Sequence, residues 1–455
     1  MSQSMQWSKL LTRFRLGKTE DESEINSTRT AFQRDFDRVV FSSAFRRLQD
    51  KTQVHPLARS DYVRTRLTHS LETASVGRSL GTITGIQLLK RHPELKEAGY
   101  EEADFGAIVA AASLAHDIGN PPFGHAGEDA IQEWFEYSET GREILALIHQ
   151  QYHADFLRFE GNAQGLRNLC YLANTEQTGG LRLTCATLGT FMKYPRHAAA
   201  AGTEPGRVSA KKHGYFQAER SLVKEIAKHC GLIESVDGVW RRHPLALLME
   251  AADDICYRIV DIEDGYRNGI LNQEESCKVL RAVAQLPEAE ETRYQSLKRP
   301  EKKIEMLRAK SIDHVVRASI EVFMDKEADI LAGVFDQSLI DLTPLADALN
   351  ACQELTRERI YPARGQSGIQ KAGYTVIEAQ LECLAGAVLA HWRHETTGSK
   401  LRGSHQAALK LLPEQFLTSG ELYTRILGVT DFIAGMTDRY AVDLYRRITG
   451  MALGG

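Results

Sequence analysis

The residues best suited to chemistry are a histidine and an aspartate, His116 and Asp117, that follow directly on one another. They end the segment DFGAIVAAASLAHD, which is apolar on nearly every side and predicts a helix buried within the protein. Two ligand-type side chains at the end of a buried helix would be costly without a partner, and a metal ion would supply one. A single His-Asp pair is common, so this pair alone does not define a site.

Three further groups of ligand-type residues could converge on this pair. His69 lies in RTRLTHSLE, Asp253 lies in MEAADDICYRIVD, and His125 and Glu128 stand close behind the pair. Two imidazoles and two carboxylates form a mixed nitrogen and oxygen site, which suits Mg²⁺ or Mn²⁺, with Fe²⁺, Co²⁺ or Zn²⁺ as alternatives, and leaves positions for water and a phosphate oxygen. The 7 cysteines form no C-x-x-C pair, so a thiolate site is disfavoured.

The elements that must position these residues are predicted to be helices. Apolar residues recur at helical spacing over 31–48, over 68–88 and over 244–270. The buried helix stops at 118–122, where a glycine and two prolines break it. Since no sustained strand alternation, fixed-period repeat or low-complexity tract is present, the sequence predicts an all-α fold.

The rest of the chain suggests a division into three parts. Residues 1–30 are polar and charge-mixed and predict a mobile N-terminal arm. Residues 31–275 form the predicted core, within which 196–214, rich in Ala, Gly and Lys, predicts an exposed loop that could close over a ligand. Amphipathic segments broken by prolines predict a C-terminal helical region, 276–455, packed on the core.

Composition and charge exclude several classes of protein. With 455 residues, 43% of them apolar, the chain can bury a large core, and its net charge of -4 argues against coating nucleic acid or an anionic membrane through its overall field. The N-terminus lacks an apolar signal, and no stretch reaches the roughly 18 apolar residues of a membrane span. Scattered cysteines fit a reducing compartment. We therefore expect a cytoplasmic protein with no membrane partner.

The ligand-type residues follow one another in the order H…HD…D, within longer strings. These strings are FSSAFRRLQDKTQVHPL (41–57), RTRLTHSLE (64–72), HDIGNPPFGHAGE (116–128), RFEGNAQGLR (158–167) and EAADDICYRIVDIEDG (250–265). The order H…HD…D is the signature of the HD phosphohydrolase superfamily, and the strings resemble one branch of it, the deoxynucleoside triphosphate triphosphohydrolases or dGTPase family. The resemblance implies an HD-domain helical core with additional C-terminal helices. It also implies metal-dependent hydrolysis of dGTP, or of several deoxynucleoside triphosphates, to deoxynucleoside and inorganic triphosphate.

The same resemblance implies which residues bind the metal. Carried over by motif, the ligands are His69, His116, Asp117 and Asp253. The motif leaves Asp253 and Asp254 as alternatives. Helical spacing favours Asp253, because it shares a face with Tyr257 and Asp261 at i, i+4 and i+8. We expect Asp254 to make a structural contact.

Catalytic and phosphate-binding roles are implied in the same way. His125 would move a proton, on the attacking water or on the leaving oxygen, with Glu128 placed to orient and charge-tune it. Arg66 and Lys212 would bind the phosphates, and Asn120 would add a polar contact.

Sugar recognition would fall to Gln53, Tyr257 and Asp261. A tight contact at the 3′-hydroxyl leaves no room for a 2′-hydroxyl and so would favour deoxynucleotides. RFEGNAQGLR stands where some relatives carry a further catalytic histidine, which this chain lacks. Glu160 and Asn162 are therefore weaker candidates whose role stays open.

Two other functions remain as alternatives. The first is an HD phosphohydrolase acting on another nucleotide phosphoester. The second is a nucleic-acid-responsive regulator with a non-catalytic HD site, in which the basic run 293–310 would contact single-stranded DNA, although such runs are more often solvated helix faces. The resemblance further implies a homo-oligomer that responds to a nucleotide effector. Base preference, oligomer size and the physiological metal stay open.

Overall fold

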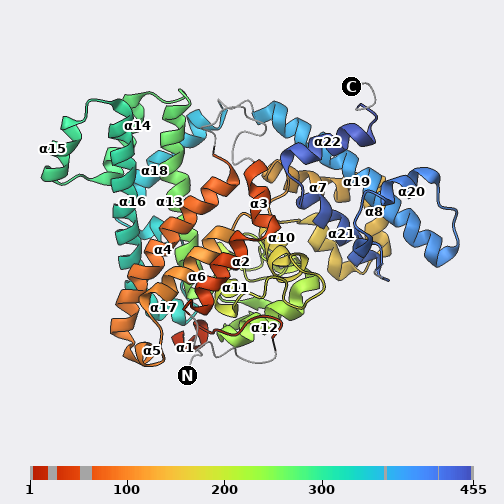
Figure 1. Ribbon diagram of the computed structural model, residues 1–455, viewed down its shortest axis with the longest axis horizontal. Coiled ribbons are helices and arrows are strands. Elements are labelled where there is room, and N and C mark those ends of the chain that lie inside the picture. The colour runs from red at the N-terminus through yellow and green to blue at the C-terminus, as the bar shows by residue number, and fades with distance from the viewer. Residues whose placement is uncertain (1–3, 19–27, 52–63, 363–365, 419, 452–455) are drawn as a thin grey trace.

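The computed structural model describes residues 4–18, 28–51, 64–362, 366–418 and 420–451 (Figure 1). Helices dominate these residues, and β1 (Glu234–Val236) and β2 (Val239–Trp240) pair as one short antiparallel hairpin. The prediction of an all-α fold is confirmed.

Two hydrophobic clusters organise the helices. The first centres on α4 (Arg66–Arg91), α6 (Glu102–Ala115) and α13 (Pro244–Arg267). Its other helices are α1 (Trp7–Leu10), α2 (Ala31–Val40), α3 (Ser43–Arg47), α5 (Pro93–Glu97), α11 (Cys185–Phe191), α12 (Arg220–Cys230), α14 (Gln273–Ala284), α15 (Glu288–Ser296), α16 (Pro300–Asp325), α17 (Glu327–Leu331) and α18 (Ala346–Leu355). Most of the sequence motifs therefore belong to one core.

The second cluster joins the middle of the chain to its C-terminal part. Its helices are α7 (His125–Tyr137), α8 (Glu139–Leu147), α9 (His153–Leu157), α10 (Gly161–Arg167), α19 (Gln366–Thr397), α20 (Gly403–Leu409), α21 (Leu422–Ala434) and α22 (Asp438–Ile448). Helix α10 contacts both clusters, through Leu166 in the first and Ala163 in the second. The boundaries expected at residues 30 and 275 stay predictions, because packing alone does not define separately folding units.

Local sequence fixes where the central helices begin. Thr65 caps α4 in a reciprocal arrangement with Thr68, and Glu101 and Asp104 do the same for α6. Helices α4 and α6 approach closely, since a Cβ on Gly81 would stand 2.5 Å from the carbonyl oxygen of Phe105. Such close packing fixes the ends of both helices, where ligand-type residues lie.

The expectation of a mobile N-terminal arm is wrong for residues 5–16. Leu10, Leu11 and Leu16 are fully buried in the first cluster. The buried Arg15 guanidinium donates a hydrogen bond of 2.6 Å to the carboxylate of Asp35. Apolar residues in this segment are interspersed with polar ones, so its composition concealed a face that packs against the core.

Two other expectations need correction. The helix expected over 31–48 is broken in two, because the Ser42 side chain caps the start of α3. The segment 196–214 is not a freely exposed loop, since Arg196 is 1% and His213 is 2% exposed. Its Ser209 donates its hydroxyl to the buried carboxylate of Asp336, which fixes it to the body of the protein.

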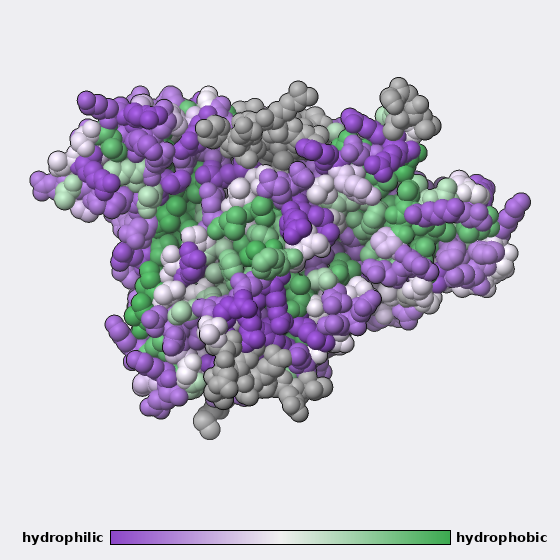
Figure 2. Space-filling model, in the orientation of Figure 1, coloured by the Kyte–Doolittle hydropathy of each residue, from purple (hydrophilic) through white to green (hydrophobic). Residues whose placement is uncertain are grey.

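The surface in Figure 2 is hydrophilic over the outer side of α14 to α16. Hydrophobic side chains reach it in the groove that α4, α13 and α16 line, where Val76, Ile83 and Val316 lie. Among the described residues, none of the helices has both the length and the apolar character needed to cross a membrane.

Candidate metal centre and substrate pocket

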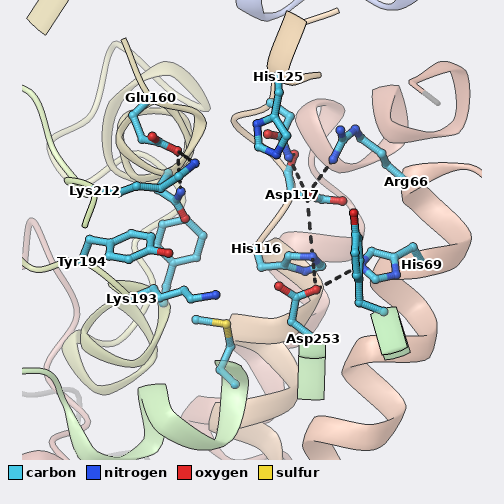
Figure 3. Close-up of a pocket in the computed structure, with 15 residues that line it drawn as sticks. Arg66, His69, His116, Asp117, His125, Glu160, Lys193, Tyr194, Lys212 and Asp253 are labelled. Carbon is cyan, nitrogen blue, oxygen red and sulfur yellow. Dashed lines mark hydrogen bonds and ion pairs between the residues drawn. The ribbon is translucent and has the colours of Figure 1, made fainter. Parts of the chain in front are cut away.

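One pocket gathers most of the residues singled out in the sequence (Figure 3). It is lined by Arg66, His69, His116, Asp117, Asn120, His125, Glu160, Asn162, Phe191, Lys193, Tyr194, Lys212, Met249, Asp253 and Tyr257. Ligand-type side chains form one wall, and lysine, tyrosine and glutamate side chains form the opposite wall.

The ligand-type wall brings two histidines and two aspartates together. The Nε2 atom of His69 lies 3.2 Å, and that of His116 3.5 Å, from Oδ1 of Asp253. His116 Nε2 also lies 3.7 Å from Oδ1 of Asp117. Ligand atoms of His69, His116 and Asp117 all lie within 4.8 Å of one another. His69 comes from α4, and His116 and Asp117 follow the last residue of α6; these three could hold one ion. Asp253 of α13 lies beside them, against both histidines.

Two observations test whether this wall suits a metal ion. His116 donates its Nδ1 proton to the carbonyl oxygen of Ser113 over 2.6 Å, which directs the lone pair of Nε2 toward the aspartates. Oδ2 of Asp117 is buried and has no hydrogen-bond partner among the described residues. A buried carboxylate oxygen without a donor calls for a cation, so these residues fit a divalent ion with nitrogen and oxygen ligands.

Electrostatics at this wall favour charged carboxylates. Burial alone would raise the pKa of Asp253, but His116 and His69 hold it well below its ordinary value. Burial likewise opposes the charged form of His69, yet the hydrogen bond to Asp253 and the charge of Asp117 raise its pKa. Burial would also raise the pKa of Asp117, but Arg66 and His116 hold it below its ordinary value, so both aspartates favour the charged form.

Asp117 is oriented by two neighbours. Arg66 donates to its Oδ1 over 2.9 Å, and the side-chain amide of Asn120 donates to the same atom over 2.5 Å. Asn120 belongs to the turn after α6, which a glycine lets pass close to α10, because a Cβ on Gly119 would stand 2.0 Å from the carbonyl oxygen of Gly161. With Oδ1 occupied, Oδ2 is the atom left for an ion.

His125 stands at the mouth of the pocket with Glu128 behind it. Nδ1 of His125 donates to Glu128 over 2.6 Å, and the other oxygen of Glu128 accepts the backbone N–H of Gly161 over 2.7 Å. The hydrogen bond to Glu128 raises the pKa of His125, whose side chain is 78% exposed. Glu128 itself is buried and does not line the pocket. The imidazole is thus held in place and favoured in its protonated form.

The opposite wall carries positive charge. Lys212 donates to Glu160 over 2.8 Å, and the amide of Asn162 donates to the same carboxylate oxygen over 2.9 Å. Lys193 reaches the pocket beside Tyr194, with its ammonium 3.4 Å from Glu250. Burial opposes its charge, but Tyr194 and Glu250 raise its pKa well above the ordinary value.

Sequence reasoning missed Lys193, Tyr194, Phe191 and Met249. Lys193 and Tyr194 follow α11 directly, in a connection without helical periodicity. A Lys-Tyr pair in such a segment resembles ordinary surface, so no local pattern distinguished it. A signal was available only in its position a few residues before the segment 196–214, which contains Lys212.

Among the described residues, Tyr257 is the predicted sugar contact that lines the pocket. Tyr257 lines the pocket, is 38% exposed and lies edge-on to Tyr361 with ring centroids 6.3 Å apart. Asp261 is buried and does not line the pocket, and Gln53 lies outside the described residues. Asp254 points elsewhere, as expected, and accepts a long hydrogen bond of 3.4 Å from the Ser338 hydroxyl.

Comparison with known proteins agrees with this geometry. Residues 66–163 match the HD domain model, and residues 405–447 match a phosphohydrolase-associated domain. A deoxyguanosinetriphosphate triphosphohydrolase-like protein of Synechocystis sp. is 45% identical to this chain, over 99% of this chain and 100% of its own. One of Pseudomonas aeruginosa is 41% identical, over 98% of this chain and 99% of its own. The deoxyguanosinetriphosphate triphosphohydrolase of Salmonella schwarzengrund is 31% identical over 92% of this chain and 93% of its own.

The chain belongs to the deoxyguanosinetriphosphate triphosphohydrolase-like family of the HD superfamily. The resemblance inferred from the motifs is thereby confirmed, and the chain is a hydrolase. The matched HD segment holds His69, His116 and Asp117, while Asp253 joins them from α13, beyond that segment. The second matched segment lies in the C-terminal region, where the sequence showed no motif.

Proposed function

We propose that this dGTPase-like hydrolase cleaves deoxynucleoside triphosphates to deoxynucleoside and inorganic triphosphate with the help of one divalent ion. The ion would be held by His69, His116, Asp117 and Asp253. The observation that carries the proposal is the opposition of the two walls, with ligand-type residues on one side and Lys193 and Lys212 on the other. A polyphosphate between them would meet charges of the required sign along its length.

Each residue around the pocket has a physical task in this reaction. A bound divalent ion lowers the pKa of water and polarises a phosphoryl oxygen. Arg66 lines the pocket beside Asp117 and would bind a non-bridging phosphate oxygen. Lys193 and Lys212 would bind the outer phosphates and hold the triphosphate while the bond from the α-phosphorus to the nucleoside 5′-oxygen breaks.

His125 would transfer the proton. Because Glu128 holds Nδ1, its Nε2 is the atom available to the substrate. The hydrogen bond to Glu128 raises the pKa of His125, which favours the protonated imidazole and a role as the acid toward the leaving 5′-oxygen. Tyr257, half-exposed in the pocket, would pack against the sugar, with Asp261 and Gln53 as further proposed contacts.

The test is a screen of the four deoxynucleoside triphosphates with Mg²⁺, Mn²⁺ or Co²⁺, in which triphosphate, pyrophosphate and phosphate are separated. We expect deoxynucleoside and triphosphate in equal amounts, with no product after chelation. Release of pyrophosphate or phosphate would contradict the proposal and favour an HD phosphohydrolase acting on another phosphoester. The base preferred and the ion that supports the fastest turnover follow from the same screen.

A regulator without catalysis is the weaker candidate. The basic run 293–310 lies on α15 and α16, where Lys302 pairs with Glu305, Arg308 with Glu263 and Lys310 with Glu290. None of the residues in this run, all of which the structure describes, lines the pocket, so the run supplies no contact to a nucleotide bound there. A homo-oligomer, a nucleotide effector, single-stranded DNA as a partner and a cytoplasmic location stay predictions.

A further inference from the structure

Lys51 is a buried lysine outside the pocket that the proposed reaction does not use. It is 2% exposed, and its ammonium contacts two backbone carbonyl oxygens, those of Asn120 at 2.5 Å and Ala434 at 2.7 Å. Ala434 is the last residue of α21, so the ammonium lies at the negative end of that helix. Burying a lysine is costly, which makes its two backbone contacts informative.

The backbone of Lys51 makes a third contact. Its carbonyl oxygen accepts the N–H of Arg66, the first residue of α4, over 3.0 Å. Lys51 therefore holds both residues that donate to Oδ1 of Asp117: Arg66 through the main chain and Asn120 through the ammonium.

The turn after α6 has a second attachment to the C-terminal region. The N–H of Phe123 donates to the carboxylate of Asp438, the first residue of α22, over 3.0 Å. Phe123 has a φ of 65°, which is unusual for a residue with a side chain and shows that the turn is constrained. The turn that carries Asn120 thus contacts the corner between α21 and α22 at two points.

We propose that Lys51 is a positioning residue that fixes the orientation of Asp117 and makes the α21–α22 corner part of the support of the metal centre. The role of Lys51 rests on one part of the proposed function, the binding of the ion by Asp117. Burial and the charge of Arg47 lower the pKa of Lys51 to about 7, but the neutral amine also carries two N–H groups for the two carbonyls. The positioning role therefore does not depend on its charge.

The test is direct binding of Mn²⁺ to the metal-free full chain, measured by calorimetry, beside turnover. In Lys51→Met, which keeps the length of the side chain but removes its donors, we expect Mn²⁺ affinity to fall by about 10-fold or more, as for other residues that orient ligands. Turnover should fall mainly in kcat, since the main-chain carbonyl of residue 51 still holds Arg66, and Lys193 and Lys212 keep their places. Lys51→Gln keeps a shorter side chain with a donor, so its Mn²⁺ affinity should lie between those of wild type and Lys51→Met. It serves as the test if Lys51→Met does not fold.

Two controls make the result specific. Lys90→Met removes an exposed lysine from the last turn of α4 and should change neither the Mn²⁺ affinity nor the turnover. In Lys51→Ala, ethylamine should restore part of the Mn²⁺ affinity, relative to sodium chloride at equal ionic strength, because the amine can refill the space between the two carbonyls. A role in stability alone would lower the melting temperature without this recovery of metal binding.

The outcomes separate the two proposals. If the wild-type chain neither binds Mn²⁺ nor releases triphosphate, the proposed function fails. If wild type binds Mn²⁺ and Asp117→Asn does not, while folded Lys51→Met and Lys51→Gln bind it as tightly as wild type, only the role of Lys51 is overturned.

Discussion

One wall of the pocket is formed by helices, and the opposite wall by the segments between helices. His69 lies in α4 and Asp253 in α13, and His116 follows the last residue of α6. Lys193 follows α11, and Lys212 lies in the connection before α12. An ion requires ligands fixed within a fraction of an ångström, which packed helices provide, whereas phosphates can be met by long lysine side chains on connections. In the proposed function the ion is therefore held from helices and the outer phosphates from connections, while Arg66 of α4 would bind a phosphate from the helical wall.

The sharpest test of this separation removes a ligand from the helical wall. In His116→Ala we expect Mn²⁺ binding to be lost and kcat/KM to fall by about 10³-fold or more, because a bound ion supplies several kcal/mol of stabilisation to the transition state. Calorimetry and release of triphosphate measure the two effects, and circular dichroism should show near-normal helix content. His149→Ala, at an exposed histidine, is the matched control. Turnover retained by His116→Ala would count heavily against the site.

Changes on the opposite wall should leave the ion in place. Lys193→Met and Lys212→Met each remove one charge-assisted contact to phosphate, so kcat/KM should fall by about 10- to 100-fold. Mn²⁺ affinity should stay within about 2-fold of wild type, since neither ammonium contacts a proposed ligand. Lys211→Met, the exposed neighbour of Lys212, is the control and should behave as wild type. Loss of Mn²⁺ binding in either pocket variant would show that the two walls act as one unit.

Pocket residues on or next to long helices were easier to predict from the sequence than residues on connections between helices. The proposed ligands lie on or next to long helices with clear apolar periodicity. Helical spacing placed Asp253 on the same face as Tyr257, and both line the pocket, whereas Asp254 does not. Lys193 lies in a connection, whose course depends on tertiary contacts such as the pairing of its ammonium with Glu250. The burial of Leu10 and Leu11 was missed for a related reason, since their partners are distant in sequence.

The pair formed by His125 and Glu128 tests which step needs a proton. Glu128→Gln removes the partner that raises the pKa of His125, so that pKa should fall toward its ordinary value of about 6.5. If His125 is the acid, activity is lost as pH rises through its pKa, and in the variant the alkaline limb of the rate profile moves to lower pH. If it is the base, the acidic limb moves to lower pH instead. A profile in which neither limb moves would remove His125 from the proton transfer.

The smallest effect on catalysis is expected at Asp155, which lies behind the opposite wall, here called the connection wall because Lys193 and Lys212 lie in connections between helices. This fully buried carboxylate accepts the N–H of Gln217, five residues beyond Lys212, at 2.9 Å and the hydroxyl of Tyr423 at 2.7 Å. Burial raises its pKa to about 7, although both donors oppose the rise. Because the folded state then binds a proton that the unfolded state releases above about pH 4, the contribution of Asp155 to stability falls as pH rises from about 4 to 7.

Asp155→Asn keeps an acceptor for both donors but carries no charge at any pH. The free energy of unfolding of Asp155→Asn relative to wild type should therefore rise between pH 5 and pH 8 by about 2 to 3 kcal/mol, measured by urea unfolding. Mn²⁺ affinity should not change, since Asp155 supports only the connection wall. A stability difference that is flat with pH would mean that Asp155 is ionised throughout, with the nearby Arg167 outweighing burial. A change in Mn²⁺ affinity would instead mean that movement of the connection wall reaches the helices that hold the ion.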